Sequence, residues 1–61
     1  MNHERQLELQ IIQLALNVSE ESLRTARLKS RHNNSAFEEL SKAIDAIEKT
    51  RAAIQKEYDN E

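Results

Sequence analysis

Hydrophobic and polar positions follow a helical period along almost the whole chain, and strong helix formers (Leu, Ile, Ala, Glu, Gln, Lys and Arg) dominate it. The clear break is residues 31–35, where Asn33 and Asn34 stand side by side. Asparagine tolerates the left-handed backbone that often ends a helix. We therefore predict a single domain over residues 1–61, with a first helix over about 3–31, a turn at 32–35 and a second helix over about 36–58.

The start of the second helix has a sequence signature of its own. Ser35 is followed three residues later by Glu38, the spacing of a capping box in which each side chain satisfies a free backbone N–H. A further helix start is conceivable at Ser19–Ser22, which would divide the first helix. The competing interpretation, which we prefer, is one continuous helix supported by the i,i+4 pair Glu20 and Arg24.

The second helix carries one hydrophobic stripe with spacings of three and four residues, typical of packing against another helix. The stripe consists of Phe37, Leu40, Ile44, Ile47, Arg51, Ile54 and Tyr58. Arg51 interrupts it and has two interpretations: its stem packs while its head reaches water or Glu48, or it fixes the register of the helices. Two acid-first i,i+4 pairs, Glu38–Lys42 and Asp45–Lys49, favour the helix further.

The first helix is apolar on more than one side, because two hydrophobic seams run along it at different azimuths. One seam is Leu7, Ile11, Leu14 and Val18; the other is Leu9, Ile12, Leu16, Leu23 and Ala26. The polar strip between them is narrow and consists of Gln6, Gln10, Gln13 and Asn17. One partner helix cannot cover both seams.

These patterns predict an all-α fold, an antiparallel two-helix hairpin that assembles into a homodimeric four-helix bundle. We expect Leu9, Ile12 and Leu16 to be the residues left outside the hairpin. The predicted oligomer interface comprises Leu7, Leu9, Ile11, Ile12, Leu14, Leu16, Val18, Leu23, Ile47 and Ile54. A higher bundle, or a monomeric hairpin that meets a host protein through the same face, stays open.

Composition narrows the function classes. The chain has 61 residues and no cysteine, glycine or proline, which excludes disulfides, thiol chemistry and Gly-rich phosphate loops. His3 and His32 have no second histidine or cysteine at metal-ligand spacing, and no serine has an activating partner in a motif. We predict a non-enzymatic protein without metal or cofactor. There is no apolar run of membrane-spanning length, and residues 1–6 do not resemble a secretory signal, so we expect a cytoplasmic protein without a membrane partner.

Charge is unevenly distributed around a net value of −2. The predicted turn lies beside a cluster of basic residues that we name the apex cluster: Arg24, Arg27, Lys29, Arg31 and His32. One interpretation is contact with a partner protein, an anion or a nucleic acid. The other is that cations near the end of the first helix complement its dipole and bind nothing.

Three resemblances bear on function. The capped hairpin resembles, in architecture, the plasmid-encoded RNA-binding four-helix-bundle repressors. Residues 40–45 resemble the core motif of hairpin sporulation phosphatases at Ser41 and Asp45, whereas Lys42 and Ala43 stand where that family has Gln and Glu. The opening residues, MNHERQLELQIIQLAL, resemble the small early-region accessory proteins of lambda-like phages. The last resemblance implies a regulatory role in phage development or host takeover, in the host cytoplasm.

Together these observations predict a small regulatory protein that acts by protein–protein interaction, with itself and with a further protein. Its candidate contacts are the apex cluster and the strip of Gln10, Gln13 and Asn17. The alternative is a nucleic-acid-binding regulator that uses the basic apex cluster, for which binding should weaken steeply with salt.

Overall fold

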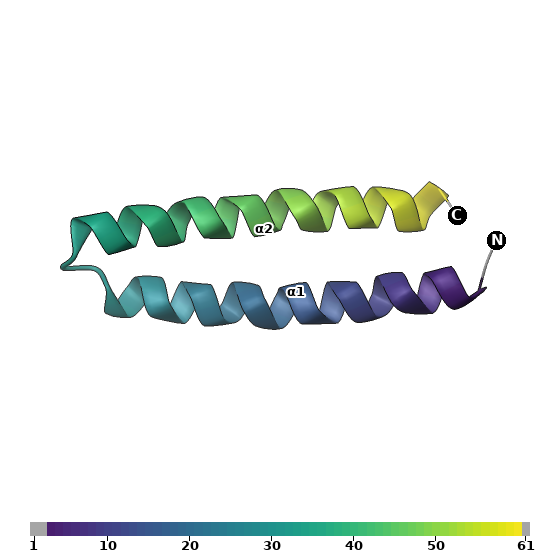
Figure 1. Cartoon of the computed structure of the whole chain (residues 1–61), viewed down its shortest axis with the longest axis horizontal. Coiled ribbons are helices and arrows are strands. Elements are labelled where there is room, and N and C mark those ends of the chain that lie inside the picture. Colours follow the sequence, from purple (N-terminus) through teal and green to yellow (C-terminus); the bar gives the residue numbers. More distant parts are fainter. Residues whose placement is uncertain (1–2, 61) are drawn as a thin grey trace.

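Two long helices form the fold. The computed structural model describes residues 3–60, with α1 over His3–Lys29 and α2 over Asn34–Asn60. The helices lie side by side and antiparallel, joined at one end, with both termini at the other (Figure 1). Residues 3–60 contain no strand, and the molecule extends about 48 Å along the helix direction. The predicted all-α antiparallel hairpin is confirmed.

The turn between the helices differs from the prediction in how it is capped. The side-chain oxygen of Asn33 accepts a hydrogen bond from the Ala36 backbone N–H at 3.1 Å, and the Asn33 carbonyl accepts one from Phe37 at 2.9 Å. Asn33 is therefore the N-cap of α2. The predicted capping box of Ser35 and Glu38 is wrong, since α2 already includes Ser35.

The first helix ends without a left-handed residue. No residue in the described range has a positive φ angle. Instead the Ser30 N–H donates to the Arg27 carbonyl at 3.1 Å, and the Asn33 N–H donates to the Ser30 carbonyl at 2.8 Å. These short-range hydrogen bonds turn the chain in four residues without glycine, so the left-handed end expected from the paired asparagines is not used.

Helix α1 is continuous through residues 17–22, which confirms the preferred interpretation and removes a helix start at Ser19–Ser22. Of the predicted acid-first pairs, Asp45 and Lys49 form an ion pair at 3.1 Å. Lys42 instead pairs with Glu39 at 3.3 Å rather than with Glu38.

The core is a thin line of side chains between the two helices. Leu9 of α1 is fully buried and Ile44 of α2 is 2% exposed. The rest of this layer is half-buried and includes Ile12, Leu16, Leu23, Leu40, Ile47 and Ile54. We name the α1 part of it, Leu9, Ile12, Leu16 and Leu23, the inner seam.

The structure corrects which seam of α1 faces outward. Leu9 was expected outside the hairpin together with Ile12 and Leu16, yet these residues pack toward α2. The other seam is left exposed, and we name it the outer stripe. The exposed fractions are 45% for Leu7, 66% for Ile11, and 65% for both Leu14 and Val18. The alignment of the two helices that buries Leu9 also brings polar groups of α1 and α2 together, as described below.

The outer face of α2 is different in character. It carries four exposed charged residues: Glu38, Lys42, Asp45 and Lys49. Water can solvate this face, so it needs no partner helix to cover it. In the described range, neither helix is long and apolar enough to cross a membrane.

Candidate functional site

The outer stripe contains four of the six large hydrophobic side chains that are exposed among residues 3–60. Leu9 and Val18 are nine residues apart, which at about 100° per residue places them on opposite sides of α1. The inner seam and the outer stripe therefore point in nearly opposite directions. Since α2 covers the inner seam, no residue of α2 can reach the outer stripe of the same chain. Anything that covers the outer stripe has to come from outside this hairpin.

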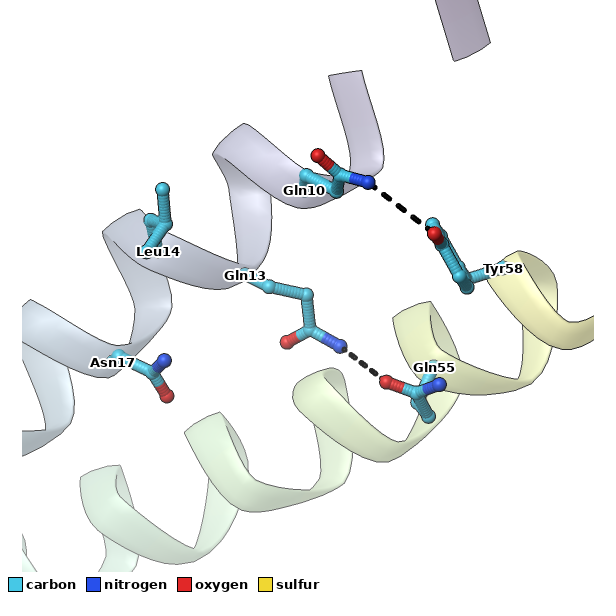
Figure 2. A pocket seen from close by; sticks show the side chains of 6 residues that line it. All are labelled: Gln10, Gln13, Leu14, Asn17, Gln55 and Tyr58. Atoms are coloured by element: carbon cyan, nitrogen blue, oxygen red, sulfur yellow. Dashed lines mark hydrogen bonds between the residues drawn. The ribbon is translucent and has the colours of Figure 1, made fainter. Parts of the chain in front are cut away.

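A shallow groove connects this stripe to the line between the helices. It encloses about 350 Å³ and is lined by Gln10, Gln13, Leu14, Asn17, Gln55 and Tyr58, which we call the amide groove. Figure 2 shows these side chains, with two cross-helix hydrogen bonds drawn. Leu14 belongs both to the groove and to the outer stripe, so the two surfaces are continuous.

Side-chain amides span the two helices inside the groove. The Gln10 amide donates to the Tyr58 hydroxyl at 3.2 Å. The Gln13 amide donates to the Gln55 side-chain oxygen at 3.4 Å (Figure 2). It also lies 3.4 Å from the Arg51 carbonyl. The side-chain oxygen of Gln13 is itself buried and accepts no hydrogen bond from the described residues. The groove therefore offers neutral hydrogen-bonding groups, with one acceptor unsatisfied.

A charged cluster lies next to the groove, between the middles of the two helices. Glu20 is 8% exposed, although it carries a carboxylate. One carboxylate oxygen accepts hydrogen bonds from the Arg24 guanidinium at 2.7 and 3.0 Å. The other accepts one from Arg51 Nη1 of α2 at 2.5 Å. Arg24 also reaches Glu48 across the hairpin at 3.0 Å. Burial of the carboxylate is tolerable because two guanidinium groups surround it.

The charged cluster shifts the pKa values of Glu20 and Arg24. Hydrogen bonds from Arg24 and then from Arg51 lower the pKa of Glu20 below its ordinary value of 4.5. The hydrogen bond with Glu20 raises the pKa of Arg24. Both shifts favour the charged forms, so the ion pairs are intact at neutral pH.

Arg51 thus has a cross-helix partner that sequence reasoning missed. Its head group was expected to reach water or Glu48, but its ion pair is with Glu20, 31 residues away in the chain. The pair could have been anticipated, because Glu20 follows Leu16 by one turn on the side of the inner seam, as Arg51 follows Ile47 on the stripe of α2. When an acidic residue interrupts one hydrophobic seam and a basic residue interrupts the facing seam at the same level, the two indicate a buried ion pair.

The structure divides the apex cluster into two parts. Arg24 is held by Glu20 and Glu48, as described above. Arg27 lies over the Phe37 ring, 5.7 Å from its centroid, and its guanidinium is 3.4 Å from the Ser41 hydroxyl. Arg31 contacts His32, its neighbour in the chain, and both are exposed together with Lys29. Only Lys29, Arg31 and His32 therefore present their charge or ring outward at the tip of the hairpin.

The open end of the hairpin is held by another cross-helix ion pair. The Arg5 guanidinium donates to the Glu57 carboxylate at 2.5 and 2.9 Å and to Glu8 at 3.0 Å. These contacts, with Glu57 first, raise the pKa of Arg5. Charge pairs therefore fix the register near the open end and at mid-height, while the apolar core between them is thin.

Residues 3–60 bring together no group of three or more His, Cys, Asp or Glu side chains that could hold a metal ion. His3 is exposed at the open end and His32 at the apex, so the hairpin places the two histidines at opposite ends.

Comparison with known proteins gives no match among family models, curated proteins or solved structures. Function is therefore inferred from the surfaces of the hairpin itself.

Proposed function

We propose that this chain is a small, non-enzymatic regulatory protein that acts by binding other protein chains, and that its first partner is a second copy of itself. The observation that carries the proposal is the outer stripe, four apolar side chains on α1 that no other part of the hairpin can cover. Full burial of one such side chain stabilises by about 1.5–3 kcal/mol. Exposed apolar stripes of this kind are typical of helix-to-helix contact surfaces.

The small number of buried apolar residues within one hairpin supports self-association. Only Leu9 and Ile44 are buried apolar residues in the described range, and a chain of this size is marginally stable alone. A second copy supplies an identical stripe, so one symmetric contact covers both stripes at once. The resulting particle contains four helices, and its free surfaces are the tips at the turns and the charged faces of α2.

The amide groove supports a binding role rather than catalysis. Four of its six lining residues carry neutral amides, and none carries a carboxylate, an imidazole or an amine. Such a lining can hydrogen-bond to a partner, and beyond the Tyr58 hydroxyl it offers no acid, base or nucleophile. A cytoplasmic location remains a hypothesis of this proposal. The resemblance of residues 1–16 adds a second hypothesis, a phage accessory role in a host cell.

The experiment is sedimentation equilibrium over a wide range of chain concentration, with helicity measured by circular dichroism. The wild-type chain should have twice its 7.1 kDa mass at high concentration. Ile11→Asp places a charge in the outer stripe and should give a helical monomer. Ala53→Asp places the same charge on an exposed position of α2 and should stay dimeric. A wild-type monomer at all concentrations would exclude self-association, and Ile11 would then be tested as the contact for a different protein.

The alternative is a nucleic-acid-binding regulator that uses the apex cluster. Its support is the exposed trio of Lys29, Arg31 and His32. Against it, Arg24 is already neutralised by two carboxylates and Arg27 lies on an aromatic ring. Few phosphate contacts imply a shallow dependence of binding on salt. Binding to duplex RNA or DNA that is lost in the double variant Lys29→Gln, Arg31→Gln would favour this alternative.

A further inference from the structure

From the charge distribution and the outer stripe, we infer that the second copy packs antiparallel along α1, so that each turn extends past the open end of the partner. The inference rests on the proposed self-association and specifies its geometry. In it the two α1 helices are central and the two α2 helices are peripheral.

The position of the stripe determines the order of the helices. The outer stripe lies on the side of α1 opposite to α2, as the nine-residue separation of Leu9 and Val18 requires. A square bundle needs each helix to contact neighbours at about a right angle to each other. Contact through the outer stripe instead gives a row of four helices, α2, α1, α1 of the partner and α2 of the partner.

The charges of the hairpin favour opposite directions for the two copies. Around the turn, beyond the neutralised Arg24, residues 27–43 carry four cations against Glu38 and Glu39, a net charge of two positive units. At the open end, residues 3–13 and 52–60 carry four carboxylates against Arg5 and Lys56, a net charge of two negative units. A parallel pair would place like charges together at both ends. An antiparallel pair separates the like-charged ends and directs the basic end of each copy toward the side of its partner's acidic open end.

The apolar residues determine the register. The stripe extends from Leu7 to Val18 and is followed along the same line by Glu21 and Thr25. Two stripes overlap fully in an antiparallel pair when facing residues have numbers that add to about 25, as in a regular pairing of heptads. Leu7 then faces Val18 of the second copy, and Ile11 faces Leu14 of the second copy.

The flanks of the contact agree with this register. Gln10 and Asn17 of the amide groove lie along one edge of the outer stripe. The sum of their residue numbers is close to the 25 that defines the register. In the antiparallel pair Gln10 therefore lies near Asn17 of the second copy, where two neutral amides can donate to and accept from each other.

Engineered disulfides test the direction, because the natural sequence contains no cysteine. Leu7→Cys and Val18→Cys chains are oxidised separately and as a mixture, and Ala53→Cys serves as the background control. In the antiparallel pair two copies of Cys at position 18 are separated by about 16 Å along the helices, beyond the Cα separation of about 7 Å that a disulfide allows. We expect the mixed disulfide to exceed either homodisulfide by about tenfold. Efficient formation of the homodisulfide at position 18 would overturn the inference.

A spin-label measurement gives the same answer without altering the outer stripe. Ser35→Cys carries a label at the exposed turn. In the antiparallel dimer two labels should be about 60 Å apart, and in a parallel dimer about 30 Å apart, given the helix rise and interaxial spacing. A dimeric mass with the short distance overturns the antiparallel direction and leaves the proposed self-association intact. A monomeric mass overturns both.

Discussion

Glu20 and Arg51 form an ion pair between the two helices, with 2.5 Å between carboxylate oxygen and guanidinium nitrogen. Glu20 is buried and Arg51 is half-buried, so the pair is part of the packed layer rather than of the solvated surface. Because a buried charge must be matched, sliding α2 along α1 by one turn would leave Arg51 without its carboxylate and Glu20 with Arg24 alone. The pair therefore helps to specify how the two helices align.

Replacing the carboxylate should expose this dependence. Glu20→Gln leaves the guanidinium groups of Arg24 and Arg51 without their shared counter-charge, so we expect a clearly lower thermal midpoint and lower helicity. Asp45→Asn removes the same charge from an exposed i,i+4 pair and should change the midpoint by little. Thermal unfolding followed by circular dichroism compares the two. Equal midpoints for both variants would show that the buried pair contributes no more than a surface pair.

The same cluster predicts a dependence on acidity. The folded-state pKa of Glu20 is lowered below 4.5 by Arg24 and Arg51, so the unfolded chain binds this proton more readily. Its contribution to stability is then fully present above about pH 5 and is lost as pH falls through the lower folded-state pKa. Urea unfolding from pH 7 to pH 2 should show a decline that is smaller in Glu20→Gln. An identical decline in both chains would contradict this assignment.

The cap of α2 provides another test. Asn33→Ala removes the side-chain oxygen that accepts from the Ala36 N–H, and should lower the free energy of unfolding by about 1 kcal/mol. Ser35→Ala, at the position suggested by the sequence motif, should change it by only a few tenths of a kcal/mol. Urea denaturation of the two variants decides between the caps. A larger loss in Ser35→Ala would restore the capping box.

How much of this was predictable from sequence depends on the feature. The helices, their antiparallel arrangement and the continuity of α1 followed from periodicity and from the short break, which are local signals. The cap was misplaced because three adjacent residues, Asn33, Asn34 and Ser35, are all good N-caps. Only the backbone path of the turn selects Asn33 among them.

The choice between the two seams of α1 was not predictable from hydrophobicity alone. Leu7, Ile11, Leu14 and Val18 are at least as apolar as the residues that α2 covers. Polar partners decide the matter, since the side of Leu9 also carries Glu20, which meets Arg51 of α2. A sequence search that scores only apolar periodicity omits this contribution.

An unsatisfied acceptor in the amide groove leads to a stabilising substitution. The Gln13 side-chain oxygen is buried without a hydrogen bond from the described residues, and its amide hydrogen bonds are long at 3.4 Å. Gln13→Leu replaces this group with an apolar one of similar size, and should raise the free energy of unfolding by about 1 kcal/mol. Gln10→Leu, which removes an exposed hydrogen bond to Tyr58, should give no such gain. A destabilised Gln13→Leu chain would show that the amide bonds matter more than the unsatisfied oxygen.

The most direct test of self-association through the outer stripe is the dependence of the thermal midpoint on chain concentration. If the folded chain is a dimer in equilibrium with unfolded monomers, mass action raises the midpoint as concentration increases. We predict a rise of several degrees over about a hundredfold range for the wild-type chain, and a constant, lower midpoint for Ile11→Asp. A wild-type midpoint that is independent of concentration, with a monomeric mass, would contradict the assignment of the outer stripe to a second copy.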